Sequence, residues 1–264
     1  MKRLSWTQWR PFACLPVAAI LFAAGCGGDG SSDPTPTPTP TPVPKRVAMV
    51  SYGYSGMLWA GSLSSSCDEI RMYKNILQTL AQRETGIRVL YAQESTCDPR
   101  TDPQWCRLVS EWARLAPFFN MINSVGTIEF KPYTSVDPYA YDVVILDCCR
   151  TSLTTIRDRV LTYINTAHGG MWVVGSNSCY RSGTPSSQLA NSIVQEYGIR
   201  MTTEDPTARG CHALTAEEKT GILKDVASID FFRMAPQTVA SPARSVLLND
   251  AGQHLIAVYE RTVD

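Results

Sequence analysis

The sequence has no excess of charge of either sign, because 24 Lys and Arg residues stand against 24 Asp and Glu residues over 264 positions. Nucleic-acid binders usually show a basic face, so this balance argues against that class of function. The chain has no internal repeat. Two C-x₂-C pairs are typical of zinc sites, and this sequence does not contain two such pairs. We therefore expect no nucleic-acid partner, no metal and no cofactor.

A long hydrophobic run is also missing. The apolar stretch 11–24 is shorter than the roughly 20 residues that a membrane-spanning helix needs. It follows three positive charges, Lys2, Arg3 and Arg10, and no acidic residue occurs in 1–25. A basic start followed by a short apolar run is typical of a secretory signal.

The end of the apolar stretch, LFAAGC over residues 21–26, resembles a bacterial lipobox. Small residues stand beside the expected cleavage point, and Cys26 would carry the lipid. The resemblance implies a signal peptide over 1–25 and a palmitate-bearing lipoprotein held to the membrane through Cys26. Gly27 after the cysteine implies delivery to the outer membrane. The alternatives are an ordinary cleaved signal with an incidental cysteine and an uncleaved anchor.

Residues 26–44 contain little that could form a core. Glycines and serines are followed by alternating Thr and Pro from Pro34 to Pro42. Such a segment cannot bury enough apolar area to offset its ordering entropy, and its prolines favour an extended chain. We expect a spacer that holds one folded domain, 45–264, away from the membrane.

The folded part alternates short apolar runs with stretches of helical periodicity. This alternation predicts βαβ units and a parallel sheet covered on both faces. Two late strands joined by a turn predict an antiparallel hairpin at a sheet edge. The expected strands are 46–53, 88–92, 127–131, 142–147, 171–175, 245–249 and 254–260, and the expected helices are 68–83, 103–123, 153–166 and 188–197.

A family resemblance is carried by the stretches 141–147, 160–164, 169–175, 191–199, 212–215, 245–249 and 255–260. The first four resemble the class I glutamine amidotransferase-like superfamily, and the last three are similar to its non-amidotransferase branches. The resemblance implies an α/β fold, a flavodoxin-like three-layer sandwich with a mainly parallel sheet and a late antiparallel edge hairpin.

The family's chemistry needs a nucleophilic cysteine on a tight turn, in the pattern Gly-x-Cys-x-Gly. Here the residue two after Gly175 is Asn177, which cannot act as a nucleophile, and Cys179 is displaced by two positions. His212 has Leu214, and not an acid, two positions on. The resemblance therefore favours a domain without catalysis that serves ligand binding or envelope assembly. The alternative is an envelope hydrolase that uses Cys179 with His212.

Seven cysteines follow Cys26, and the oxidising cell envelope favours their pairing. Cys97 and Cys106 flank a short loop that a disulfide could close. Cys67 and Cys211 can supply further partners, and the odd total leaves one thiol over.

Three cysteines follow predicted core strands. Cys148 and Cys149 come after the strand 142–147, and Cys179 comes soon after the strand 171–175. Parallel neighbouring strands bring such ends together, so a disulfide from Cys149, or its neighbour, to Cys179 is expected. The alternative is a metal or thiol cluster of these three cysteines with His212.

Polar residues gather at the same strand ends, where open α/β sheets bind ligands. Asp147, Arg150, Ser176, Asn177 and Arg181 are the candidate ligand-binding residues, for a polar small molecule or a sugar. The alternative is that Asp147 and Arg150 pair with each other or cap the next helix. The sequence names no protein partner.

Overall fold

The computed structural model describes residues 44–52, 67–94, 112–177, 179–204, 211–230 and 234–263. The expected signal peptide, the lipid site at Cys26, the spacer up to residue 43, and the pair Cys97 and Cys106 lie outside the described residues. The start of the expected helix 103–123 lies outside them as well.

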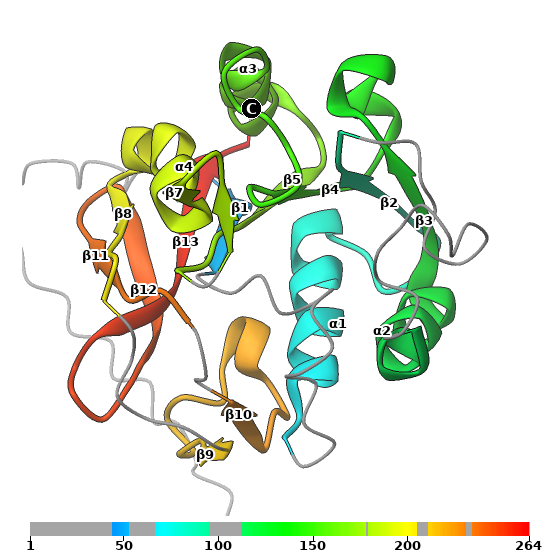
Figure 1. Ribbon diagram of the computed structural model, residues 1–264. Helices are drawn as coiled ribbons and strands as arrows, with labels where there is room; N and C mark the ends of the chain where they lie inside the picture. Colours follow the sequence, from blue (N-terminus) through cyan, green and yellow to red (C-terminus); the bar gives the residue numbers. More distant parts are fainter. Residues whose placement is uncertain are drawn as a thin grey trace, which may run out of the picture. The chain divides into compact units, whose positions relative to one another are not determined.

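Five parallel strands form one half of the main sheet (Figure 1). In spatial order they are β3 (Gly126–Lys131), β2 (Ile87–Ala92), β4 (Val143–Asp147), β5 (Gly170–Val174) and β1 (Lys45–Tyr52). All residues of β4 and β5 are buried, as parallel strands covered on both faces require. The α/β class and the largely parallel sheet are thus confirmed.

The strand order differs from the expected flavodoxin-like one. In that order the first strand lies between the second and the third. Here β4 and β5 insert between β1 and β2, so β1 lies at the far end of the parallel strands. The sequence pattern marks where strands form, but the pairing order depends on tertiary contacts that the pattern does not show.

The other half of the sheet is antiparallel. It consists of β13 (His254–Thr262), β12 (Ala243–Leu248), β11 (Gln237–Val239) and β8 (Ile199–Met201). The expected late hairpin is present as β12 and β13, but β13 lies inside the sheet, antiparallel to β1 as well. The expected position of the hairpin at an edge of the sheet is therefore wrong for β13, which pairs with β1 in the interior of the sheet.

Helices cover both faces of the parallel strands (Figure 1). Alternate strand residues point to opposite faces, so Ile145 packs with α1 and α2 while Val144 packs with α3 and α4. The helices are α1 (Glu69–Ala81), α2 (Trp112–Val125), α3 (Arg157–Thr166) and α4 (Ser186–Val194), with 3-10 turns at Tyr133–Ser135, Pro138–Ala140, Gln195–Tyr197 and Gly221–Leu223. In the described ranges, no helix is long and apolar enough to cross a membrane.

Gly198 follows α4 and its 3-10 turn, directly after the end of the expected helix 188–197. Its φ of 79° lies in the left-handed region that favours glycine. A Cβ there would lie 2.3 Å from the carbonyl oxygen of Ala240. Glycine is therefore required both by the left-handed backbone conformation and by the close approach of the segment at Ala240.

A two-stranded ribbon, β9 (Cys211–Ala213) and β10 (Ser228–Asp230), joins the start of α1 (Figure 1). Cys67 forms a disulfide with Cys211, and their Cα atoms are 5.4 Å apart. The Asp230 amide donates to Glu69 Oε1 at 2.6 Å. The ribbon is thus attached to the helix by a covalent bond and by a buried carboxyl group.

We predict that Trp172→Ala lowers the free energy of unfolding by about 3–5 kcal/mol. Trp172 is fully buried, and its ring centroid lies 5.4 Å from that of Tyr73 and 6.4 Å from that of Tyr52. Urea unfolding measures the change. Leu248→Ala, at a half-exposed side chain, is the control and should cost less than about 1 kcal/mol. Equal losses in the two variants would contradict this packing.

We also predict that Glu69 makes the free energy of unfolding depend on pH. Burial raises the pKa of Glu69 from 4.5 to about 7. The folded protein holds the carboxyl proton of Glu69 more tightly than the unfolded chain does. The stabilisation that results is therefore fully present below about pH 4.5 and is lost as the pH rises through 7. At pH 8, Glu69→Gln should therefore exceed the wild type in stability by up to about 3 kcal/mol, with little difference at pH 4.5.

Thermal or urea unfolding at several pH values tests this expectation. Glu84→Gln, at an exposed residue just beyond the other end of α1, is the matched control and should change the free energy of unfolding by less than about 1 kcal/mol. A stability difference between wild type and Glu69→Gln that stays constant from pH 4.5 to 8 would exclude the proposed titration.

Candidate functional site

The candidate site is the carboxyl edge of β4 and β5, where two loops leave the sheet side by side. Asp147 stands opposite Val174 in the β4–β5 ladder. A disulfide joins Cys149, in the loop after β4, to Cys179, in the loop after β5, with 6.0 Å between the Cα atoms. This is one of the two pairings that the strand ends allowed. Cys148 is the other cysteine there; it is buried as a free thiol, and burial raises its pKa.

The carboxyl group of Asp147 is buried and makes its hydrogen bonds within the protein. It is 2% exposed, and it accepts hydrogen bonds from the Tyr91 hydroxyl and from the Cys149 amide, the latter at 2.9 Å. Arg150 Nε lies 3.8 Å from it, which is the internal pairing considered as the alternative to ligand binding. Burial raises the pKa of Asp147, and also that of Tyr91. Asp147 therefore shapes the loop and does not face an open cavity.

The turn after β5 is held to the start of α4 by hydrogen bonds. The Ser176 amide donates to Ser186 Oγ at 2.8 Å, and Ser186 Oγ donates to the Ser176 carbonyl at 3.1 Å. Asn177 is 8% exposed; its Nδ2 donates to the Glu204 carbonyl at 2.7 Å, and its Oδ1 accepts from the Ser187 hydroxyl. Both ends of the Asn177 amide thus have structural partners.

Arg181 lies on a small hairpin formed by β6 (Tyr180–Arg181) and β7 (Thr184–Pro185). It forms an ion pair with Glu94, in the loop after β2. Tyr180 is 62% exposed. The hairpin follows Cys179 directly, so the disulfide fixes its base.

Cys179 and His212 occupy different surroundings. The sulfur of Cys179 is bonded to Cys149. His212 lies on β9, and its Nδ1 is 3.5 Å from an Asp250 carboxylate oxygen. The thiol–imidazole pair that the alternative, a hydrolase, requires is therefore not assembled in this structure. Among the described residues, no group of three or more His, Cys, Asp or Glu side chains is placed to hold a metal.

A cavity of about 400 Å³ lies beside the disulfide-linked loops. Arg181 lines it, whereas Asp147, Ser176 and Asn177 are buried in the contacts described above. The sequence did not point to Arg157, which also lines the cavity from the start of α3. An arginine on an exposed helix turn carries no distinguishing signal in a single sequence.

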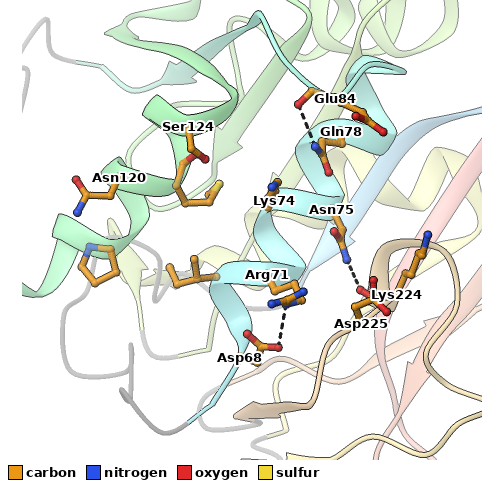
Figure 2. A pocket seen from close by; sticks show the side chains of 13 residues that line it. Asp68, Arg71, Lys74, Asn75, Gln78, Glu84, Asn120, Ser124, Lys224 and Asp225 are labelled. Atoms are coloured by element: carbon orange, nitrogen blue, oxygen red, sulfur yellow. Dashed lines mark hydrogen bonds and ion pairs between the residues drawn. The ribbon is translucent and has the colours of Figure 1, made fainter.

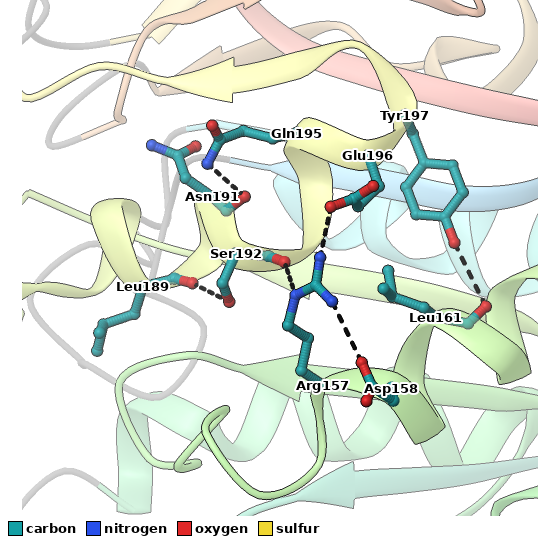
Figure 3. A network of polar contacts seen from close by, with 9 residues as sticks. All are labelled: Arg157, Asp158, Leu161, Leu189, Asn191, Ser192, Gln195, Glu196 and Tyr197. Carbon is teal, nitrogen blue, oxygen red and sulfur yellow. Dashed lines mark hydrogen bonds and ion pairs between the residues drawn. The ribbon is translucent and has the colours of Figure 1, made fainter.

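Arg157 also joins α3 to α4 (Figure 3). Its Nε donates to the Ser192 carbonyl at 3.0 Å, its Nη1 donates to Asp158 at 3.2 Å, and its Nη2 pairs with Glu196. These bonds fix the guanidinium at one wall of the cavity.

A second hollow, of about 680 Å³, lies along α1 and α2 on the opposite face of the sheet (Figure 2). Charges of both signs line it, among them Arg71, Lys74, Lys224, Asp68 and Asp225. Several of these groups make local contacts, such as the ion pair between Arg71 and Asp68 at 3.4 Å. The mixed charge gives this groove no preference for one class of ligand.

Comparisons with protein-family models, with curated proteins and with solved structures found no match.

We predict that replacing both Cys149 and Cys179 by Ser lowers the free energy of unfolding by about 3.5 kcal/mol, because the bond closes a loop with a sequence separation of 30 residues. Urea unfolding under oxidising conditions measures the loss. Cys148→Ala removes a cysteine from the same loop without breaking a bond, and should cost about 1 kcal/mol. The assignment of the bond would be wrong if Cys148→Ala were the more damaging change.

Proposed function

We propose that this chain is a bacterial lipoprotein, anchored to the outer membrane through Cys26, whose amidotransferase-like domain binds a ligand and does not catalyse a reaction. The observation that carries the proposal is the residue that occupies the turn after β5. Where the family places a nucleophilic cysteine, this chain has Asn177, and hydrogen bonds hold both ends of its amide.

The cysteine chemistry of the loop supports the same reading. A nucleophilic thiol must be free and ionisable, with a base within hydrogen-bonding reach. Cys179 is instead bonded to Cys149. The remaining thiol, Cys148, is buried, and its pKa is raised, which disfavours the reactive thiolate. The open cavity beside these loops offers a place for a ligand.

The anchor rests on the sequence. The lipobox-like stretch 21–26 supplies the modified cysteine, and the Thr/Pro-rich spacer would hold the domain off the membrane. The cell envelope is also oxidising, which agrees with two disulfide-bonded pairs in the described part of the chain.

An assay of turnover tests the absence of catalysis. We expect the oxidised wild type to release no ammonia from glutamine and to hydrolyse simple esters no faster than the Cys149→Ser/Cys179→Ser variant. The variant is the matched control because it lacks the same sulfur atoms. Turnover by the wild type that disappears in Cys179→Ser and in His212→Ala would contradict the proposal and support the hydrolase alternative.

Metabolic labelling with an alkyne fatty acid tests the anchor. We expect the wild type to take up label and Cys26→Ala to lose it, since that sulfur would carry the lipid. Cys14→Ala alters a cysteine inside the stretch that the signal peptidase removes, so it should leave the label unchanged. Label that persists in Cys26→Ala would refute lipidation at this residue.

A further inference from the structure

The cavity beside the disulfide has walls from four segments. They are the loop after β4, the first turn of α3, the β6–β7 hairpin and the first turns of α4. Its volume of about 400 Å³ falls within the range of about 300–1,000 Å³ that is typical of small-molecule sites. It lies at the carboxyl edge of the parallel strands, where α/β sheets commonly bind ligands.

The charge of the cavity has one sign. Arg157 and Arg181 line it from two different walls, and no carboxylate is among its described lining residues. The acids that pair with these arginines, Asp158 and Glu196 at Arg157 and Glu94 at Arg181, lie outside the lining. The two guanidinium groups therefore favour an anion in the cavity.

Both guanidinium groups retain donors for a ligand. A guanidinium has five N–H groups. Arg181 donates one of them to Glu94, and its side chain is 29% exposed. Arg157 donates to three partners, and its side chain is 39% exposed. Arg181 thus has more donors for a ligand, while Arg157 is held rigidly by its own partners.

The rest of the lining suits a hydroxyl-rich molecule. Ser152 and Thr154 come from the loop after β4, Thr184 from the hairpin and Gln188 from α4. Hydroxyl and amide groups both donate and accept hydrogen bonds, as the hydroxyls of a sugar do. Leu189 adds an apolar patch on which the carbon face of a ring can lie.

We propose that this cavity binds an acidic sugar, a ring of uronic-acid type whose carboxylate pairs with Arg181 and Arg157 and whose hydroxyls bind the Ser, Thr and Gln side chains. This inference rests on the proposed function, because it names the ligand class of that binding domain. The disulfide between Cys149 and Cys179 keeps the two loops that carry the walls at a fixed spacing, so the site is preformed.

Calorimetric titration of the oxidised protein with D-glucuronate tests the proposal. D-glucose, which has the hydroxyls but not the charge, should bind at least 10-fold more weakly, and acetate, which has the charge but not the ring, should do the same. Arg181→Gln should weaken glucuronate binding about 10-fold or more, since a charge-assisted hydrogen bond is lost. Arg244→Gln is the matched control, because Arg244 is likewise an arginine paired with a glutamate, Glu260, and is not among the residues that line the cavity.

Absence of glucuronate binding, equal binding of glucose, or equal affinity in wild type and Arg181→Gln would overturn the acidic-sugar assignment. Each variant is first shown to be folded by its unfolding midpoint. These outcomes concern the ligand alone, whereas thiol-dependent turnover of the wild type would contradict the proposed function. The two failures are therefore distinguishable.

Discussion

The pairing of β4 with β5 is the constraint on which the candidate site depends. Their parallel register places Asp147 beside Val174, so the two following loops leave the sheet at neighbouring points. The disulfide from Cys149 to Cys179 can form because those loops start so close together. The hairpin that carries Arg181 and the first turn of α3 then form the walls of one cavity.

The polar groups of this edge divide into two sets with different roles. Asp147, Ser176 and Asn177 face inward and supply hydrogen bonds that hold the loops against the sheet and α4. A buried polar group without a partner would be costly, so these residues are used structurally. Arg157 and Arg181 face the cavity, and they give it the positive character on which ligand binding would depend.

Local patterns predicted the longer helices and strands, but they predicted neither the six short strands β6 to β11 nor the order in which the strands pair. The helix expected over 153–166 begins at Arg157, because residues 153–156 form a turn first, and the strand 142–147 is close to β4. The position of β1 beside β5 and the position of β13 inside the sheet, between β1 and β11, were not predictable, since they depend on contacts between distant segments. The internal use of Asn177 was hidden for the same reason, because its amide is held by residues 10 and 27 positions further on.

The most direct measurement of the central claim is peptide mapping of the native, unreduced protein after alkylation. The account predicts a peptide containing Cys149 linked to one containing Cys179, and a Cys148 thiol that reacts only after unfolding, since it is buried. Rapid alkylation of Cys179 in the native, unreduced protein would contradict the account, because the loop after β5 would then present a free sulfur beside the turn at Asn177.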